Sequence, residues 1–380
     1  MIENILLSMP MYVSGICFLL LMLKWLSTKR KADAAISCFW LFSTFLYIGH
    51  YVFFCRVSSL LPVSDSVYCA CNLAIFPSFL VYLQILTGQK KHLRLTQVMI
   101  LFALFCGIII GVLYSYMDAG EKEAFIESYL YQNEHHGFQG LIAIQIVVHI
   151  LFKVFFAVTV IFTVIFGFKY IEQFNTLVDS IYADTEDKKI NHITGILVLL
   201  VTTSIISFAA NAIGRHMFFG SLWIEIIPSV IFSSLLLGIG HTSLHQNFSY
   251  EDMEKEGVNI ATILGEVQDD KDAKPLLQAM NRLLNEDLIF LEQGLKVTDF
   301  AKRLGTNQKY IYNILHDELG LSFSEYINQK RIDYAEQLIN THPELSLQEI
   351  CQKSGFSSTS SFYRNFKLFK GYTPKNNDYK

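Results

Sequence analysis

The chain has 380 residues, of which 52% are hydrophobic and only 17% are charged, and its net charge is −4. A length of this kind allows two or three domains. About a quarter of an ordinary soluble protein is charged, so this composition excludes a chain that is soluble throughout. The negative net charge excludes a general electrostatic attraction of the whole chain to nucleic acid, so any affinity for DNA must come from a local patch.

Seven apolar runs occupy the chain up to about residue 245. Each is long enough to cross a hydrocarbon core about 30 Å thick, which takes about 20 apolar residues in a helix. The first run has no basic leader and no small-residue cleavage site, so we expect an uncleaved span. The runs lie near Ile5–Leu23, Ala34–Phe54, Val67–Thr87, Val98–Met117, Ile142–Phe168, Ile193–Ile213 and Leu222–His241.

The basic residues of the short loops predict an orientation, because Lys and Arg are enriched in cytoplasmic loops. The loops after the first, third and fifth runs are the basic ones, whereas the loop from Asp118 to Gly140 is acidic. We therefore expect the N-terminus outside and the chain beyond the seventh run in the cytoplasm. The basic residues are Lys24, Lys29, Arg30, Lys31, Lys90, Lys91, Arg94, Lys169, Lys188 and Lys189.

The seven cysteines form no CxxC pair and no Cys/His spacing typical of zinc, so no metal and no cofactor is expected. Cys55 ends the second run, and Cys69 and Cys71 begin the third. If this junction lies outside the cytoplasm, a disulfide from Cys55 to Cys69 or Cys71 can form. The alternative is free thiols at the membrane boundary, and the sequence leaves both open.

One face of the fifth run is polar. Gln145, His149 and Lys153 follow one another at intervals of four residues, which places them on one side of a helix. Ionisable groups within a span usually face the bundle interior or a water-filled cavity. We expect a sensor pocket there for a small-molecule or protein signal, with Glu225 as its counter-charge. The alternative is that His149 packs structurally and Lys153 extends to the membrane surface.

After the seventh run, a polar and acidic connector of residues 246–274 leads to an ordinary helical domain of residues 275–380. The expected domains are therefore a membrane domain of residues 1–245, this linker and the C-terminal domain. The fold class is all-α, with a seven-span helical bundle followed by a domain that contains two helix-turn-helix units.

The first helix-turn-helix unit begins with an apolar repeat at Val297, Phe300, Ala301 and Leu304, which is one buried face of a short helix. Gly305 ends that helix, and Asn307 suits the N-cap of the next one. The apolar positions of the second helix are Tyr310, Ile311, Ile314 and Leu315. The outward positions, on the face that a recognition helix presents to the major groove, are Gln308, Lys309, Tyr312 and Asn313.

The second unit repeats this pattern about 50 residues later. Leu347, Ile350 and Cys351 form the buried face of its first helix, Gly355 makes the turn, and Ser357 or Ser358 caps the recognition helix. Phe362, Phe366 and Phe369 form the buried stripe of that helix. Its outward positions are Thr359, Ser360, Tyr363 and Arg364, with Lys367 nearby. From Lys353 onward there are six basic residues and one acidic residue, which supplies the local positive patch that DNA binding requires.

This C-terminal part resembles the DNA-binding domain of the AraC/XylS family of bacterial transcription regulators. The resemblance is carried by AKRLGTNQKYIYNIL, by LGLSFSEYINQKRIDYAEQLI and by GFSSTSSFYRNFKLFKGYTP, within about Leu291–Pro374. It implies two recognition helices in successive major grooves of double-stranded DNA, with base contacts from Lys309, Tyr312, Asn313, Thr359, Ser360, Tyr363 and Arg364. Cys351 departs from the alanine that the family favours. The first seven runs resemble the multi-span membrane domains that a smaller set of AraC-like proteins carries.

The sequence therefore predicts a non-enzymatic, sequence-specific transcription regulator in a bacterial inner membrane, which pairs into a homodimer or is released when it receives a signal. The competing interpretation is a transporter or channel whose cytoplasmic helix-turn-helix domain regulates it. The absence of paired interrupted half-spans in the sequence favours the regulator.

Overall fold

The computed structural model describes residues 2–134, 137–213, 222–258 and 273–374. Every named regular element in these residues is helical, which agrees with the all-α prediction, and one isolated bridge pairs Tyr182 with Lys296. The chain divides into two compact units. The first, called the apolar unit below, comprises residues 1–171 and 191–249, and the C-terminal unit comprises residues 172–190 and 250–380.

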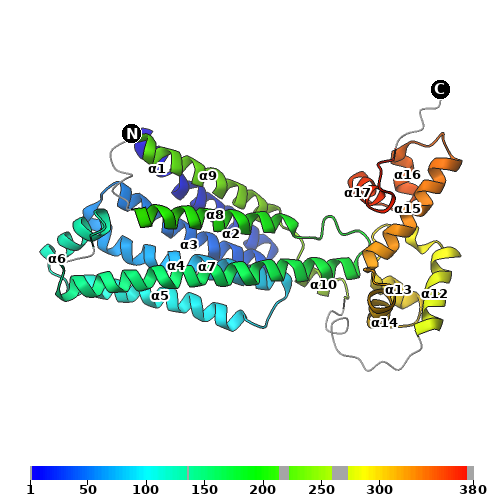
Figure 1. The fold of residues 1–380 in the computed structure, drawn as a ribbon, viewed down its shortest axis with the longest axis horizontal. Helices are drawn as coiled ribbons and strands as arrows, with labels where there is room; N and C mark the ends of the chain where they lie inside the picture. Colours follow the sequence, from blue (N-terminus) through cyan, green and yellow to red (C-terminus); the bar gives the residue numbers. More distant parts are fainter. Residues whose placement is uncertain (1, 135–136, 214–221, 259–272, 375–380) are drawn as a thin grey trace. The chain divides into compact units, whose positions relative to one another are not determined.

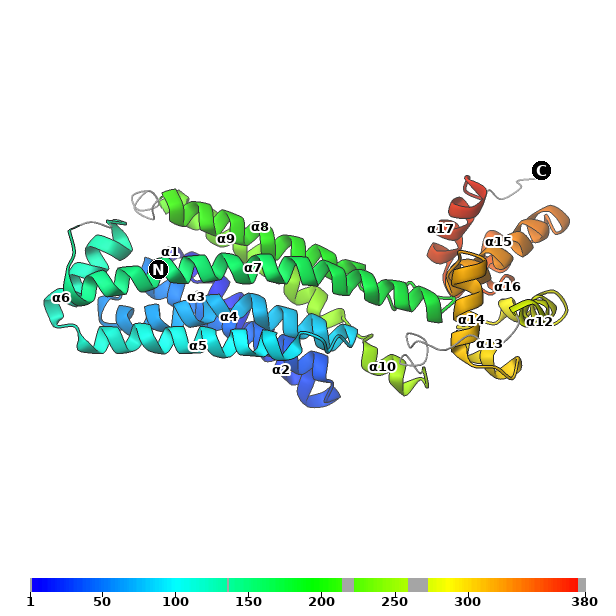
Figure 2. The same cartoon turned by 60° about the horizontal axis from the view of Figure 1, so that its bottom comes forward.

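The apolar unit is a bundle of long helices (Figures 1 and 2). Helices α9, α2, α3, α4 and α5 contact one another in that order, α1 and α8 pack on α9, and α7 lies against α4, α5 and α8. The elements are α1 Ile2–Leu7, α2 Met9–Thr28, α3 Lys31–Phe54, η1 Ser58–Leu60, α4 Leu61–Thr87, α5 Leu93–Tyr116, α6 Ala119–Ala124, the π-helical turn η2 Phe125–Tyr131, α7 Gly140–Ile181, α8 Asn191–Ile213 and α9 Leu222–His245.

Six helices among the described residues are long and apolar enough to cross a membrane, not the seven that we expected. The difference lies in α8. Only Asn191–Ile206 of this helix counts as an apolar segment, and it is too short to cross a membrane, because the side chains that follow lie outside the described residues. The six are Met9–Thr28, Lys31–Phe54, Ser58–Thr87, Leu93–Tyr116, Gly140–Ile181 and Ile226–Lys255.

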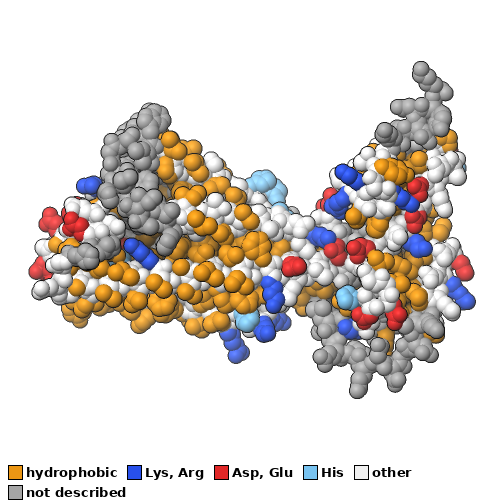
Figure 3. Space-filling model, in the orientation of Figure 1, with side chains coloured by type: hydrophobic (Ala, Val, Ile, Leu, Met, Phe, Trp, Pro, Cys, Tyr) orange, Lys and Arg blue, Asp and Glu red, His pale blue; other side chains and the backbone are white. Residues whose placement is uncertain are grey.

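The surface of the apolar unit is itself hydrophobic. Figure 3 shows hydrophobic side chains over most of its visible face, with charged side chains mainly toward its ends. Leu101, Ile108 and Ile161 are each about three-fifths exposed, so these long apolar side chains have no protein partner that covers them. A surface on which so many long apolar side chains are exposed is typical of helices that contact lipid.

Close helix packing holds α4 against α5. A Cβ on Gly107 would come within 2.6 Å of the Ala70 Cβ and 2.8 Å of the Ser66 carbonyl oxygen. Only glycine therefore allows the two helices to approach so closely, as small residues do between helices in membranes.

The end of α2 is attached to the end of α9 by hydrogen bonds. The Lys24 ammonium donates to the carbonyl oxygens of Leu244 at 2.7 Å and Gln246 at 2.9 Å.

The C-terminal unit consists of short helices around α15, the longest helix within it. Helices α16 and α17 and the turn η4 contact α15, and α13 packs on α14. Its elements are α10 Tyr250–Lys255, α12 Ala273–Asn285, η4 Ile289–Leu291, α13 Val297–Arg303, α14 Gln308–Asn313, the π-helical turn η5 Ile314–Glu318, α15 Phe323–Thr341, α16 Leu347–Lys353 and α17 Thr359–Lys370.

Each of the two units is made from two separate stretches of the chain. Residues 172–190, the end of α7 and the segment after it, cluster with the C-terminal unit, although the sequence placed them inside a membrane domain that ends at residue 245. The acidic connector also begins as ordered structure, because α10 buries Met253 completely and Val258 is 4% exposed.

Candidate DNA-binding interface

The first helix-turn-helix unit has the expected form. Helix α13 buries Val297, Phe300 and Ala301, and the chain then turns at Gly305, whose φ is +61°. The side chain of Asn307 accepts a hydrogen bond from the Tyr310 N–H at 3.0 Å and so caps α14, as predicted. Capping satisfies one of the free N–H groups at a helix start, which fixes where α14 begins.

The second helix-turn-helix unit is built in the same way. Ser346 and Glu349 form a reciprocal capping box at the start of α16, and Gly355 makes the turn with φ +82°. Of the two serines proposed as the cap of α17, Ser358 is the one that accepts from the Ser361 N–H, at 3.1 Å. Phe362 and Phe366 are buried in one cluster with Ile350 and Cys351, as the apolar pattern predicted.

Arg331 on α15 links the parts of this unit, and the sequence analysis did not single it out. Its guanidinium is fully buried and donates to the carbonyl oxygens of Phe290 at 2.6 Å and Glu292 at 2.7 Å. The same guanidinium pairs with the Asp184 carboxylate at 2.9 Å. Burial lowers the pKa of Arg331, and the attraction of Asp184 opposes that shift. The clue in the sequence is a basic residue on the apolar side of an amphipathic helix.

The predicted DNA-contact residues differ in exposure between the two recognition helices. On α17, Thr359, Ser360, Tyr363, Arg364 and Lys367 are all exposed and lie on the face opposite its buried phenylalanines. On α14, Gln308, Lys309, Tyr312 and Asn313 are only half-exposed. There the Lys309 ammonium lies 5.2 Å from the centre of the Tyr312 ring, and Tyr312 stacks on His316. Helix α17 is therefore the more accessible of the two in this structure.

The segment after α7 is fastened to the C-terminal unit by its backbone. The Ala183 N–H donates to the Leu295 carbonyl oxygen at 3.0 Å, and the Ala183 carbonyl oxygen accepts from Asn328 at 2.9 Å and from Ser324. One oxygen of Asp184 accepts from the Gly294 N–H at 2.8 Å. The side chains of Tyr182 and Ala183 are almost completely buried, so this segment forms part of the folded unit.

Glu186, in the same segment, contacts the recognition helix α17. Its carboxylate accepts a hydrogen bond from the hydroxyl of Ser358, the cap of that helix, at 2.8 Å. The other oxygen lies 3.5 Å from the Arg364 guanidinium. A residue expected to read DNA thus has an acidic partner from its own chain. No local pattern in the sequence indicates this contact, because the two residues lie 178 positions apart.

The polar face of α7 is buried within the apolar unit. His149 contacts the Asp65 carboxylate at 2.9 Å through Nε2, and its Nδ1 lies 2.9 Å from the Gln145 carbonyl oxygen. The Tyr114 hydroxyl donates to the same oxygen of Asp65 at 2.9 Å. Lys153 lies over the Tyr129 ring at 5.8 Å. The acidic partner of this face is therefore Asp65 on α4, while the side chain of Glu225, the predicted counter-charge, lies outside the described residues.

Asp65, Cys69 and His149 are the residues of this cluster that could hold a metal ion. Their ligand atoms lie within 4.8 Å of one another. The Tyr114 hydroxyl and His149 Nε2 both contact one oxygen of the Asp65 carboxylate, so the cluster is explained as a polar network between α4, α5 and α7. All seven cysteines are present as thiols in the structure, so no disulfide joins Cys55 to Cys69 or Cys71.

Comparison with known proteins identifies the C-terminal unit. Residues 300–377 match the family described as a helix-turn-helix domain, which agrees with the resemblance to AraC-type regulators. The Msm operon regulatory protein of Streptococcus mutans is 38% identical over 81 residues, which are 21% of this chain and 29% of that protein. An uncharacterized HTH-type transcriptional regulator of Bacillus subtilis, YtdP, is 32% identical over 85 residues, 22% of this chain and 11% of that one.

Several uncharacterized HTH-type transcriptional regulators of Staphylococcus aureus are 27% identical over 96 residues, 25% of this chain and 13% of theirs. The chain thus spans less than a third of the length of the curated relatives that it matches, and these matches are the length of one helix-turn-helix domain. No solved structure matches the chain.

Proposed function

We propose that the protein is a membrane-anchored, sequence-specific DNA-binding transcription regulator whose apolar unit responds to a signal from outside the cytoplasm or from within the bilayer. The observation that carries the proposal is the exposed face of α17 on a helix-turn-helix domain, in a chain whose described residues also include six apolar helices of span length. Named relatives that share this domain are regulatory proteins, which supports the same function here.

Recognition of DNA would use both recognition helices in successive major grooves of one duplex. Arg364 offers a planar donor pair that can read guanine, while Lys367 and the hydroxyls of Thr359 and Ser360 can hold phosphates. On α14 the corresponding residues are Gln308, Lys309, Tyr312 and Asn313. Pairing into a homodimer would raise the local concentration of such domains on a repeated site.

The location that fits this function is a bacterial inner membrane, with the C-terminal unit in the cytoplasm and the N-terminus outside. The basic ends of the helices support this orientation, because Lys24, Lys90 and Lys189 follow the first, third and fifth expected spans. It requires α8, a helix of 23 residues, to cross the membrane as well. A thiol-reactive reagent that does not permeate membranes, applied to cells with single cysteines at positions 92, 118 and 188, tests it. Labelling of position 118 alone agrees with the orientation.

The experiment that tests the function uses the full chain in lipid nanodiscs. Specific DNA is first selected from a random pool, and binding is then measured for Arg364→Ala and for Arg303→Ala, a matched control. Arg303 lies on α13 and pairs with Glu292 at 2.8 Å. A regulator loses about tenfold or more with Arg364→Ala, for a lost bidentate base contact worth about 1–3 kcal/mol, and little with Arg303→Ala. Recovery of no specific sequence would contradict the proposal.

The second candidate function is a transporter or channel with a regulatory helix-turn-helix domain. It is favoured by the cavity inside the apolar unit, which is described below. It predicts solute flux across liposomes that contain the protein, at a rate that Arg364→Ala leaves unchanged. A regulator gives no flux above that of empty liposomes.

A further inference from the structure

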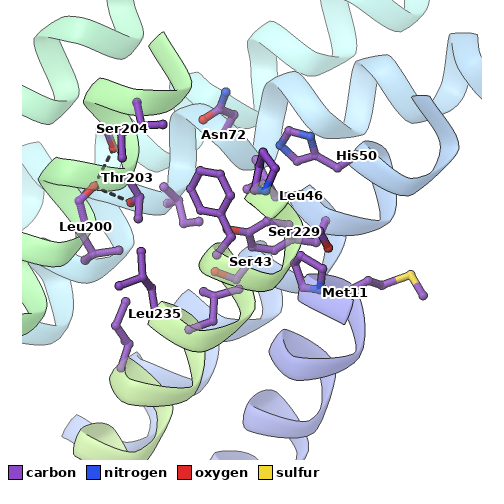
Figure 4. Close-up of a pocket in the computed structure, with 18 of the residues that line it drawn as sticks. Met11, Ser43, Leu46, His50, Asn72, Leu200, Thr203, Ser204, Ser229 and Leu235 are labelled. Atoms are coloured by element: carbon purple, nitrogen blue, oxygen red, sulfur yellow. Dashed lines mark hydrogen bonds between the residues drawn. The ribbon is translucent and has the colours of Figure 1, made fainter. Parts of the chain in front are cut away.

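The apolar unit contains a cavity of about 260 Å³ between its helices. It is smaller than the roughly 300–1,000 Å³ of sites that hold drug-sized ligands, so it suits a compact molecule. Helices α2, α3, α4, α7, α8 and α9 contribute to its wall (Figure 4). The polar face of α7 predicted as a sensor does not line it; the residue of α7 that does is Phe156.

The wall is mostly apolar, with a few polar groups on α3, α4, α8 and α9. Phe39, Leu46, Phe76, Phe232 and Leu236 are among its apolar residues. Its polar residues include Ser43 and His50, which share one face of α3, and Asn72 of α4 (Figure 4). Thr203 and Ser204 of α8 and Ser229 of α9 also line it, and their hydroxyls donate to backbone carbonyl oxygens. None of the described residues that line the cavity is Asp, Glu, Lys or Arg. A charged ligand would therefore be buried without an opposite charge, which is costly.

Ser43 is a second sign that the cavity takes a ligand. Its side chain is 1% exposed, and its hydroxyl has no hydrogen-bond partner among the described residues. Serines in helices commonly satisfy themselves on a carbonyl four residues back, as Ser204 does here with Leu200 at 2.8 Å. A buried hydroxyl without a partner costs about 1–3 kcal/mol, so an unpaired one beside a cavity indicates an external partner.

We propose that this cavity binds a compact, uncharged small molecule that is mostly apolar and carries one or two hydrogen-bonding groups, one of which pairs with Ser43. We further assign it as the place where the signal enters, and this second step rests on the proposed function. An acyl chain of a bilayer lipid shares part of this chemistry and is the other source that the test must separate.

The test uses a diazirine derivative of 1-octanol and the matching derivative of octanoate, with the full chain in nanodiscs. Photolabelling is mapped by mass spectrometry. We expect saturable adducts on cavity residues with the alcohol and not with the carboxylate. Ser43→Ala removes one hydrogen bond and should raise the concentration of the alcohol derivative that half-saturates labelling by about fivefold. Ser43→Leu fills part of the cavity and should abolish the saturable labelling of cavity residues. Ser234→Ala, on an exposed serine of α9 outside the cavity, is the matched control.

Three outcomes would overturn the proposal: equal labelling by both derivatives, labelling that Ser43→Ala leaves unchanged, or a phospholipid that stays bound in native mass spectrometry and that octanol does not displace. DNA affinity with and without octanol is measured in the same nanodiscs. A chain that binds octanol with no change in DNA affinity contradicts only the assignment as signal. A chain that selects no DNA contradicts the proposed function and leaves the binding site standing.

A second inference comes from an independent observation, the contact of Glu186 with α17. Glu186 accepts from the Ser358 hydroxyl at 2.8 Å and lies 3.5 Å from Arg364, while Asp184 and Ala183 hold the same segment in place. A carboxylate at this position pairs with a guanidinium that we expect to contact DNA, and so competes with DNA for it. It also repels the phosphates that would approach the start of the helix, where the helix dipole would otherwise favour them.

We infer that the segment of residues 182–190 holds DNA binding back, and that Glu186 must leave Arg364 for full affinity. Both side chains of the pair are partly exposed, at 55% for Arg364 and 36% for Glu186. Exposed pairs of this kind are weak, so the contact can be released without unfolding the domain. Because the segment directly follows α7, a movement of that helix would reach it along the chain.

The test compares Glu186→Gln with Asp187→Asn, an exposed neighbour in which the same change of charge occurs. We expect Glu186→Gln to raise the affinity for the selected DNA about two- to fivefold over Asp187→Asn. The gain should vanish in the background of Arg364→Ala. An equal effect of the two variants, or weaker binding by Glu186→Gln, overturns the inference. Failure of every variant to bind specific DNA would instead contradict the proposed function.

Discussion

The Arg331 guanidinium lies 2.9 Å from the Asp184 carboxylate, with the arginine fully buried and the aspartate side chain 14% exposed. The two residues lie 147 positions apart, on either side of the last apolar helices of the chain. The C-terminal unit is therefore completed by a segment that precedes those helices. The pair makes the segment after α7 a structural part of the domain that carries the predicted DNA contacts.

Replacing Asp184 should destabilise the C-terminal unit strongly. Asp184→Ala leaves Arg331 buried without its counter-charge, which typically costs about 3–5 kcal/mol. Asp187→Ala, on the exposed neighbour, should stay within about 0.5 kcal/mol of the parent. Hydrogen exchange of residues 277–374 in the full chain measures both. Equal protection of the two variants would show that the ion pair contributes little.

Loss of the Ser346 cap should weaken the second helix-turn-helix unit moderately. Ser346→Ala removes the acceptor for the Glu349 N–H at 3.2 Å, and a lost N-cap costs about 0.5–2 kcal/mol. Ser357→Ala is the control, because that exposed serine does not cap α17. Urea titration followed by limited proteolysis of the C-terminal unit should separate the two variants. An unchanged midpoint for Ser346→Ala would contradict the role of the cap.

Gly355 should tolerate no side chain, for two separable reasons. Its φ of +82° costs an L-residue about 1–2 kcal/mol, and a Cβ there would lie 2.8 Å from backbone atoms of Phe290 and Leu291. Gly371 has nearly the same φ, +81°, but a Cβ there would meet open space, so Gly371→Ala is the control. Gly355→Ala should therefore destabilise the unit clearly more than Gly371→Ala in the same urea assay. Equal effects would mean that the backbone shifts at no cost.

The end of α17 should contribute pH-dependent stability through Glu336. Hydrogen bonds, first from Lys370 at 2.7 Å and then from Tyr372, hold the pKa of Glu336 below its usual value. A carboxyl with a lowered pKa stabilises the fold above its unfolded pKa, and that stability disappears as the pH falls through the folded pKa. The loss is therefore expected below about pH 4.5, the ordinary value for a glutamate.

Glu336→Gln tests this dependence, with Glu318→Gln on an exposed glutamate as the control. Glu336→Gln should lower stability at pH 7 by no more than about 1 kcal/mol, because the pair is partly exposed. The difference in stability between Glu336→Gln and the parent should then decrease as the pH falls toward 3. Unfolding midpoints at several pH values measure it. A difference that does not depend on pH would show that the charge of Glu336 is not responsible.

The sequence by itself determined the local features of this protein. The capping residues Asn307 and Ser358, the turn glycines and the buried phenylalanines of α17 depend on neighbours within a few positions, so their spacing predicted the two helix-turn-helix units correctly. Span-length apolar runs are local too, and six of the expected helices are present. The remaining one is the sixth expected run, which corresponds to α8, and only Asn191–Ile206 of that helix is described with its side chains.

Only the tertiary structure decided which residues meet across long separations. Asp65 faces His149, Asp184 pairs with Arg331, and Glu186 contacts Arg364. The cavity beside Ser43 likewise arises between several helices. Periodicity states which face of a helix is polar or apolar, but the partner of that face depends on how distant helices pack. A single sequence carries no local signal for such pairs, since side chains of either unit could satisfy them equally well.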